Sequence, residues 1–394
     1  MTRQVADIFI AGAGLSGLVA ALGLAKAGFQ IALADPGRPV APGGTDLRST
    51  AYLQPARALL EDTGVWSDLA ADAMPLEVLR VIDCQGHPPE RRTERAFAAS
   101  DLGAPAFGWN LPNALAHRVL TEAARDTSAI SFHKTAFQRL MTRDAEARIT
   151  LSDGTKLTAR LAIAADGRTS ALREAAGVGV EVTRYGQKAL AFAVTHPVPH
   201  EAVSTELYLH GGAFVLVPLP DVEGSPASAV VWMNDGPEAK RLIALDEAAF
   251  SMAATERSTG ILGDLTLATD RQAWPVVTQK AHRLTARRVA LVAEAAHVLP
   301  PIGAQGLNTS LGDIRALIDL AAENPGELGN EAFLDRYARR RGSAIAARAR
   351  ANDLYNRICR SDVPQVQGLR ALGLKLVHDI APLRREIMRA GLDG

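Results

Sequence analysis

The sequence predicts a mixed α/β fold, with an α+β component, in which a parallel sheet layered with helices accompanies a separate β-sheet and is followed by C-terminal helices. Short apolar runs of strand length alternate with helical patterns, which is typical of a parallel sheet with crossover helices; these runs are residues 5–11, 30–34, 161–165 and 289–292. Between residues 187 and 277 the chain is instead rich in short strands. This change of pattern indicates a second sheet inserted into the first fold.

Length and composition limit the class of protein. A chain of 394 residues suggests two or three domains. Its 47% hydrophobic and 22% charged residues are ordinary for a globular protein and exclude disordered and collagen-like chains. The 43 basic and 43 acidic residues cancel, which argues against nucleic-acid binding because that needs a basic surface. Cys84 and Cys359 form no CxxC pair, and no secretion signal or spanning segment is found, so we expect a cytoplasmic protein.

Charge is nevertheless distributed unevenly along the chain. Residues 331–394 carry 13 basic and 7 acidic side chains, a net charge of +6, and the rest of the chain carries −6. This pattern has two interpretations, a set of solvated arginine-rich helix faces or a contact with an acidic partner or an anionic membrane surface.

The first 35 residues form a βαβ pattern. The strand at 5–11 leads directly into a glycine-rich turn with the order Gly12, Ala13, Gly14, Leu15, Ser16, Gly17. A helical pattern follows as far as Gly28, and the second strand, residues 30–34, ends at Asp35. Gly12 permits the tight turn, Gly14 lets the backbone approach a pyrophosphate, and Gly17 lets the helix pack closely on the strand. With free N–H groups at the helix start and a carboxylate placed for ribose hydroxyls, this unit predicts a Rossmann-like dinucleotide site.

The remaining elements are predicted in chain order. We expect an amphipathic helix over residues 49–63, although Pro55 complicates its first turns, and short mixed strands over 75–111. A helix follows over 113–126, and residues 130–151 read as a β-meander that turns at Asp153 and Gly154. A helix near 246–256 interrupts the second sheet. A further helix reaches about residue 322, a linker-type junction lies near Asn324, and helices continue to the end.

Two acids stand where buried strands end. Asp166, followed by Gly167, closes the strand at 161–165, and Glu294 closes the strand at 289–292. Ligands of open α/β sheets bind at the carboxyl ends of the strands, so both acids are candidates for a cofactor site. The first 35 residues leave the choice between NAD and FAD open.

With these motifs in place, the chain resembles the flavin-dependent aromatic hydroxylases of the para-hydroxybenzoate hydroxylase type, and within them the ubiquinone-biosynthesis (UbiH-like) hydroxylases. The resemblance runs essentially from end to end. It is carried by residues 12–17, 46–50, 166–167, 295–308, 368–375 and 382–384.

The resemblance implies FAD as the cofactor and assigns its contacts. The glycine-rich turn and Asp35 would hold the ADP half, and Arg48 would meet the phosphates. Arg48 could instead be a solvated loop arginine, and Asp166 with Gly167, placed near the pyrophosphate, could be an ordinary strand-ending turn. Glu294 would accept from the ribityl chain. The flavin pyrimidine edge would face the start of a helix whose loop and first turn include Gly303, Gly306, Leu307 and Asn308.

One departure from the family pattern is visible. The family normally has Gly-Asp where this chain has Ala293 and Glu294. Glu294 keeps the carboxylate but lengthens it by a methylene, and Ala293 adds a Cβ where the backbone runs close to FAD. His297 is interpreted as structural. We name no catalytic side chain, because the cofactor carries the chemistry, and we expect no metal site, because no pattern such as HExxH occurs.

The implied reaction is hydroxylation of an electron-rich phenol ring with NAD(P)H and O₂ through a flavin hydroperoxide. No second GxGxxG unit occurs, so NAD(P)H would bind transiently. The family suggests a polyprenylated phenol or quinol precursor of ubiquinone as substrate, with a peripheral contact at the inner face of the membrane or a place in a biosynthetic complex. Three alternatives stay open: a hydroxylase of a soluble aromatic compound, a flavoprotein component with little activity of its own, and an NAD-dependent dehydrogenase.

The motifs also predict how the domains are built. Residues 1–74, 100–180 and 275–355 would form a discontinuous FAD-binding domain. Residues 75–99 and 181–274 would form the β-sheet substrate domain, and residues 356–394 a C-terminal helical region.

Overall fold

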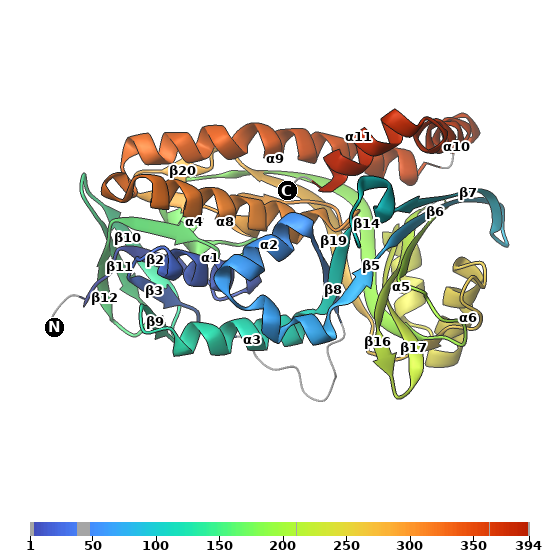
Figure 1. Cartoon of the computed structure of the whole chain (residues 1–394), viewed down its shortest axis with the longest axis horizontal. Coiled ribbons are helices and arrows are strands. Elements are labelled where there is room, and N and C mark those ends of the chain that lie inside the picture. Colours follow the sequence, from blue (N-terminus) through green and yellow to red (C-terminus); the bar gives the residue numbers. More distant parts are fainter. Residues whose placement is uncertain (1–3, 38–47, 210, 362, 393–394) are drawn as a thin grey trace.

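The computed structural model describes residues 4–37, 48–209, 211–361 and 363–392 of the chain. One half of the molecule is built on a six-stranded sheet in the order β20-β21-β13-β2-β3-β9 (Figure 1). All neighbouring strands except β20 and β21 run parallel. The strands are β2 (Ile8–Ala11), β3 (Ile31–Ala34), β9 (Ile130–His133), β13 (Leu161–Ala164), β20 (Thr285–Ala286) and β21 (Val289–Leu291).

Helices and a second sheet cover this parallel sheet. Helix α1 (Leu15–Lys26) packs between α3 (Asn113–Asp126) and α8 (Gln305–Glu323). A four-stranded sheet packs on the parallel sheet, with Phe137 against Phe9, and it consists of β1 (Gln4–Val5), β10 (Phe137–Thr142), β11 (Ala147–Leu151) and β12 (Lys156–Ala159). Because both faces are covered, the central strands are apolar throughout and fully buried.

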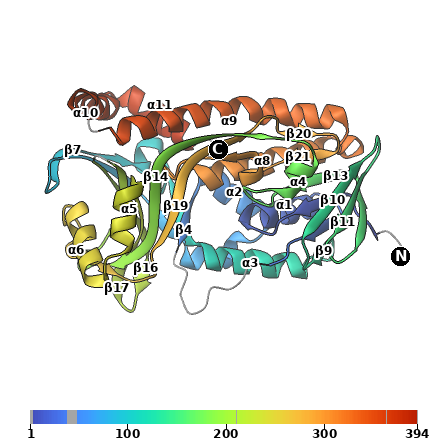
Figure 2. The same ribbon diagram turned by 180° about the vertical axis from the view of Figure 1, so that it is seen from behind.

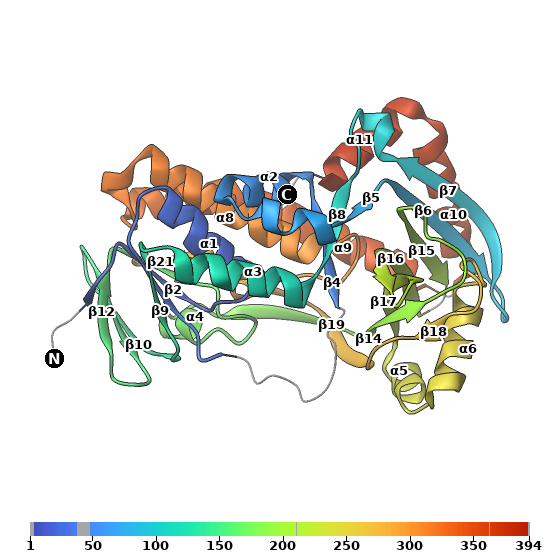
Figure 3. The ribbon, with the colours of Figure 1, turned by 60° about the horizontal axis from the view of Figure 1, so that its bottom comes forward.

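The other half of the molecule is a nine-stranded sheet in the order β22-β19-β14-β17-β16-β15-β6-β7, with β18 paired to β14. Its strands are β6 (Val78–Gln85), β7 (Glu90–Ala98), β14 (Val180–Thr195), β15 (Val203–Leu209), β16 (Gly212–Val222), β17 (Ser225–Asp235), β18 (Thr266–Leu267), β19 (Gln272–Ala281) and β22 (His297–Val298). The long strands β14 and β19 run between the two halves and join them (Figure 2). A small sheet of β4 (Ser49–Leu53), β5 (Met74–Leu76) and β8 (Gly108–Pro112) lies beside this junction (Figure 3).

The two faces of the large sheet have separate apolar clusters. One face packs against α5 (Gly236–Ile243) and α6 (Glu247–Arg257), and its cluster includes Cys84 of β6. The other cluster includes Cys359, at the end of α9 (Glu331–Cys359), together with Ile302. Both cysteines are free and buried.

The C-terminal helices continue from the cofactor half to the large sheet. Helix α9 buries Phe333, Tyr337 and Ile345 in the core of the parallel-sheet half and then extends along the molecule to Cys359. Helices α10 (Pro364–Asp379) and α11 (Ala381–Leu392) fold back as a hairpin at the far end (Figure 1). Among the described residues, no helix is both long enough and apolar enough to span a bilayer.

The structure confirms the predicted fold class and corrects four elements. Residues 49–53 form strand β4, and helix α2 (Gln54–Thr63) begins only afterwards, with Pro55 in its first turn. Strand β9 belongs to the parallel sheet, so the meander consists of β10, β11 and β12. The expected linker near Asn324 is a 3-10 turn, Pro325–Glu327, between two helices that share one core. Helix α5 was not predicted.

Candidate functional site

The glycine-rich turn lies between β2 and α1 and is shaped by close backbone contacts. Gly12 has φ +99°, and a Cβ on it would lie 2.8 Å from the Asp166 Cα. The glycine-rich turn therefore lies against the motif formed by Asp166 and Gly167. Ala13 and Ser16 are buried, and Leu15 is half-buried. No side chain caps α1 and its first turn holds no acid, so its N–H groups and the positive end of the helix dipole are available to an anion.

Asp35 ties this turn to the end of β3. Its Oδ2 accepts from the Ala13 amide at 2.7 Å, and its Oδ1 accepts from the Gly37 amide at 2.7 Å. A carboxylate oxygen can accept more than one hydrogen bond, so Asp35 can also serve ribose hydroxyls as predicted. His117 of α3, which the sequence did not single out, lies with its Nε2 2.9 Å from the Ala13 carbonyl oxygen. The turn is therefore held from both sides.

Asp166 has a local structural task. Its carboxylate accepts from the Ser170 hydroxyl and from the Leu172 amide, at 3.1 Å for the amide, and so caps α4 (Ala171–Ala175). Gly167 has φ +88°, and a Cβ on it would meet no heavy atom within 4 Å. The cap fixes the direction in which the backbone leaves β13, and it leaves the face of Gly167 open to a ligand.

Arg173, to which no role was assigned from the sequence, joins the two strand-end loops. Its buried guanidinium donates to the carbonyl oxygens of Arg168, at 3.0 Å, and Ala295, at 3.3 Å. Arg168 in turn lies 3.6 Å from the carboxylate of Glu294, whose side chain is 55% exposed. The carboxylate that the resemblance assigns to the ribityl chain is thus directed outward and is accessible to a ligand.

Ala293 occupies a backbone conformation that favours glycine. Its φ is +53°, in the left-handed region, and its amide donates to Asp313 at 3.3 Å. A non-glycine residue there costs roughly 1–2 kcal/mol because its Cβ approaches the following carbonyl oxygen. The family glycine at this position therefore has a conformational reason, and this chain tolerates alanine at a cost.

A buried charged cluster of three side chains supports the loop around Ala293. Asp313 of α8 accepts from His297 Nε2 at 2.7 Å and from Arg341 Nε at 2.8 Å, and all three residues are buried. Arg341 also donates to the Thr309 carbonyl oxygen at 3.0 Å. The cluster holds the loop, α8 and α9 in one arrangement, which supports the structural interpretation of His297.

The start of α8 is built as a second open helix terminus. Gly303 and Ala304 both have positive φ, no side chain caps the helix, and its first turn contains no acid. A Cβ on Gly306 would meet no heavy atom within 4 Å, while Leu307 packs partly against the core. Such a terminus accepts an electron-rich group at short range.

Asn308 fixes where this terminus points. Its buried side chain accepts from the Leu53 amide at 2.9 Å and donates to the carbonyl oxygens of Ala51 and Ala304, at 2.8 and 2.7 Å. The resemblance places Asn308 at the flavin, and in the structure its side chain is hydrogen-bonded to strand β4. Its contribution to a ligand site is to hold the backbone.

Arg48 lies just before β4, between the two halves of the molecule. It is half-buried, its carbonyl oxygen accepts from the Asn113 amide at 2.7 Å, and its guanidinium carbon lies 5.9 Å from the centre of the Trp274 ring. Asp46 and Leu47, which carry part of the resemblance, lie outside the described residues.

The large sheet contributes a buried carboxyl on the side of α9. Glu206 of β15 accepts a hydrogen bond from Tyr208, and the Tyr355 hydroxyl of α9 donates to the Tyr208 hydroxyl at 3.0 Å. Burial raises the pKa of Glu206, and the Tyr208 hydrogen bond only partly opposes that shift. Phe214 and Trp232 face the other side of the sheet and pack with Phe250 of α6, so they are core residues.

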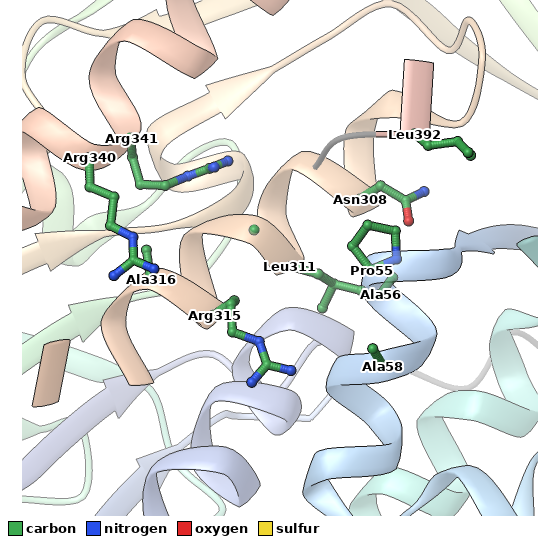
Figure 4. Close-up of a pocket in the computed structure, with 11 residues that line it drawn as sticks. Pro55, Ala56, Ala58, Asn308, Leu311, Arg315, Ala316, Arg340, Arg341 and Leu392 are labelled. Carbon is green, nitrogen blue, oxygen red and sulfur yellow. The ribbon is translucent and has the colours of Figure 1, made fainter. Parts of the chain in front are cut away.

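A hollow of about 470 Å³ is lined by residues of α2, α8 and α9 (Figure 4). Arg315, Arg340 and Arg341 line it from α8 and α9, and each forms an ion pair. Of the residues predicted to bind the cofactor, only Asn308 lines this hollow.

The described residues fit a flavin dinucleotide in their chemistry. The α1 terminus suits a pyrophosphate, Asp35 suits a ribose, and Glu294 presents an accessible carboxylate. The start of α8 leaves room at Gly306 for a planar ring. Among the described residues, no group of three histidine, cysteine or acidic side chains could hold a metal ion.

Comparison with known proteins agrees with this chemistry. A family model described as an FAD binding domain matches residues 5–352. The chain is 30% identical to a ubiquinone hydroxylase, UbiL, of Rhodospirillum rubrum, over 98% of this chain and 89% of that protein. It is 27% identical to the 3-demethoxyubiquinol 3-hydroxylase of Escherichia coli over the full length of both. Among solved structures, p-nitrophenol 4-monooxygenase PnpA from Pseudomonas putida superposes with a TM-score of 0.80 at 19% identity, covering 100% of this chain and 99% of that one.

Proposed function

The chain belongs to the FAD binding domain family and is an FAD-dependent aromatic hydroxylase, and from that premise we propose that it hydroxylates the ring of a polyprenylated phenol or quinol in ubiquinone biosynthesis. Full-length similarity to ubiquinone hydroxylases supports this substrate class. When bound, FAD supplies the chemistry that transfers one oxygen atom from O₂ to the ring, with NAD(P)H as the reductant.

The residues of this chain would bind and orient the cofactor. The first-turn amides of α1 would bind the pyrophosphate, Asp35 the ribose, and Glu294 the ribityl hydroxyls. The amides at the start of α8 would stabilise negative charge at the pyrimidine edge of the flavin. Arg48 would meet the phosphates from the β4 side.

One observation carries the proposal furthest, namely the open start of α8. Gly306 faces free space, and no side chain caps the helix. Asn308 holds the terminus through two hydrogen bonds to β4 and one to Ala304. A terminus held this firmly, with free space at Gly306, suits a ligand that the fold is built to receive.

The matched variants Gly306→Ala and Gly342→Ala test this proposal. A Cβ meets no heavy atom within 4 Å at either position, so neither change should strain the protein. Alanine should stabilise either helix by about 0.5–1 kcal/mol. Only Gly306→Ala should weaken FAD binding, measured by flavin fluorescence quenching on titrating the apoprotein. Equal FAD affinity in the two variants would remove the start of α8 from the flavin site.

The substrate class needs a separate measurement. A strain lacking the gene should accumulate a prenylated intermediate that lacks one ring hydroxyl group. The purified yellow protein should oxidise NAD(P)H faster when a prenylated phenol is added. Unchanged quinone levels in that strain would favour a soluble aromatic substrate. Hydroxylation restored by a variant that cannot bind FAD would favour a non-enzymatic role in a complex.

We also propose the domain division and location that the sequence suggests. The FAD-binding part would comprise residues 1–74, 100–180 and 275–355, with residues 75–99 and 181–274 as the substrate part and 356–394 as a C-terminal region. The protein would work in the cytoplasm, with a peripheral contact at the inner face of the membrane or inside a biosynthetic complex.

A further inference from the structure

The α10–α11 hairpin is attached firmly to the body of the protein. Arg370 of α10 forms an ion pair with Asp83 of β6 and donates to the Cys359 carbonyl oxygen at 3.0 Å. Arg384 of α11 lies 3.3 Å from Asp101. Ala371 and Met388 are buried beneath the two helices. These contacts hold the inner faces of α10 and α11 against the protein. The opposite, outer faces of the two helices are therefore held in a defined orientation as well.

The outer faces of the same helices are apolar. Leu369, Leu372 and Leu376 lie on α10, Ile380 lies between the helices, and Leu383 and Ile387 lie on α11; these six side chains are 39–67% exposed. Their spacings of three and four residues place them on one face of each helix. Of 14 exposed large hydrophobic residues in the described part of the chain, nine fall between positions 354 and 387. We call the six hairpin side chains the aliphatic face.

Positive charge accompanies this face. Lys375 and Arg385 are exposed, and no carboxylate of the described residues lies within ion-pair distance of either one. Residues 331–394 together carry a net charge of +6. The hairpin lies at one end of the molecule, where α10 packs beside β7 (Figure 1).

The composition of the aliphatic face distinguishes between possible occupants. Protein interfaces are enriched in tyrosine, tryptophan and arginine and depleted in lysine, and leucine and valine are rare among their energetic centres. The aliphatic face holds leucine and isoleucine and no aromatic ring, and a free lysine lies beside it. Helices that lie in the plane of a membrane combine an apolar face with flanking lysine and arginine.

From this combination we propose that the α10–α11 hairpin docks on an anionic lipid bilayer. The helices would lie in the interface plane, with the aliphatic face among the acyl chains and Lys375 and Arg385 at the lipid phosphates. Only the biological purpose of this docking rests on the proposed function. A polyprenylated substrate partitions into the bilayer, and a docked enzyme would receive it without the substrate crossing water.

The test is vesicle flotation of the full-length holoenzyme at low and high salt. Vesicles of phosphatidylglycerol mixed with phosphatidylcholine are compared with vesicles of phosphatidylcholine alone. The first variant carries Leu372→Ser, Leu376→Ser and Leu383→Ser, and the second carries Lys375→Glu and Arg385→Glu. The matched control carries Met141→Ser and Met252→Ser, which change exposed apolar side chains elsewhere on the surface.

The wild type and the methionine control should float with phosphatidylglycerol vesicles. Each hairpin variant should bind them about tenfold more weakly or worse, and salt should weaken the wild type. Retention of FAD absorbance in every variant shows that the fold is intact. Equal binding by the serine variant and the wild type would overturn the proposal, and so would absence of wild-type binding.

Two further outcomes separate this inference from its alternatives. In one outcome, the wild type binds no vesicles and sediments as a dimer in analytical ultracentrifugation, while the serine variant sediments as a monomer. In that case the aliphatic face is an interface between two copies of the chain, and the bilayer proposal is wrong. If the wild type binds vesicles through the hairpin but hydroxylates no prenylated phenol, the proposed function fails while the docking surface stands.

Discussion

The loops at the cofactor end and the α10–α11 hairpin distribute their side chains in opposite ways. Beneath the loops, charged groups are buried, with Asp313 fully enclosed between His297 and Arg341. On the hairpin, leucine and isoleucine side chains are exposed. Buried ion pairs are weak contributors to stability compared with apolar packing, and large exposed apolar patches commonly mark binding surfaces. Folding stability alone explains neither the buried charged groups nor the exposed apolar side chains. Each arrangement therefore indicates a role in binding a ligand.

The largest expected effect concerns the buried cluster. Asp313→Asn leaves Arg341 without its carboxylate and should lower the free energy of unfolding by about 3–5 kcal/mol, because an uncompensated buried charge remains. Urea unfolding followed by circular dichroism measures this loss. Asp319→Asn is the control, since its partner Arg340 is partly exposed, and it should cost less than about 1 kcal/mol. Equal losses would show that the cluster is no more important than a surface pair.

The next effect separates ligand binding from stability at the same loops. Glu294→Gln should weaken FAD binding by about 1.5–3 kcal/mol, or roughly ten- to a hundredfold, because a charged hydrogen bond is lost. The free energy of unfolding of the apoprotein should change by less than about 1 kcal/mol, since the ion-pair partner of the carboxylate among the described residues is the partly exposed Arg168. Isothermal titration of the apoprotein with FAD gives the first quantity. Glu238→Gln, which breaks a surface pair with Arg241, should leave FAD binding unchanged.

A smaller effect, with the opposite sign, is expected at Ala293. Ala293→Gly should raise the free energy of unfolding by about 1 kcal/mol, because glycine adopts positive φ without strain. Thermal and urea unfolding both report it. Ala296→Gly, at the end of the short helix α7 (Ala293–Ala296), should instead lower stability by roughly 0.5–1 kcal/mol. A loss in both variants would show that the backbone at 293 is not strained.

The smallest effect is expected on the hairpin. Changing Leu372 and Leu376 to serine should alter the free energy of unfolding by less than about 0.5 kcal/mol per site, because the two residues are already 52% and 48% exposed. The same urea titration applies, with Met388→Ser as the buried contrast on α11. A loss of several kcal/mol for the two leucine changes would mean that the aliphatic face is packed in solution, and the contrast between the two regions would fail.

Much of the architecture was predictable from local pattern. The helical spacing of Leu115, Val119 and Leu120 predicted α3 with its observed bounds, Asn113–Asp126. Helix α5 was missed because Gly236 and Pro237 suggest a break, whereas here Pro237 lies in the first turn and the Asp235 side chain caps the helix. At residues 49–53 a helical pattern was overridden by pairing with β8, which sequence periodicity does not report.

The positions of the predicted site residues were easier to anticipate than the tasks of their side chains. Asn308 bonds to Leu53, 255 residues earlier, and no local signal contains that contact. Asp166 caps a helix and Asp35 holds the glycine turn, so both also act on protein groups. Arg173 stands seven residues after Asp166 in the same motif, and that proximity could have marked it. Nothing in the sequence around His117 marks it as a neighbour of the glycine turn.

The two buried cysteines give this chain a pair of native reporters of local opening. Cys84 is enclosed on the α5–α6 side of the large sheet and Cys359 on the side of α9, and the sequence holds no other thiol. Burial raises the pKa of both thiols, that of Cys359 to about 12, so neither should react with a disulfide reagent while the fold is closed. Each labelling rate then measures how often its own side of the sheet opens. A ligand that tightens only the α9 side would slow labelling of Cys359 and leave the rate at Cys84 unchanged.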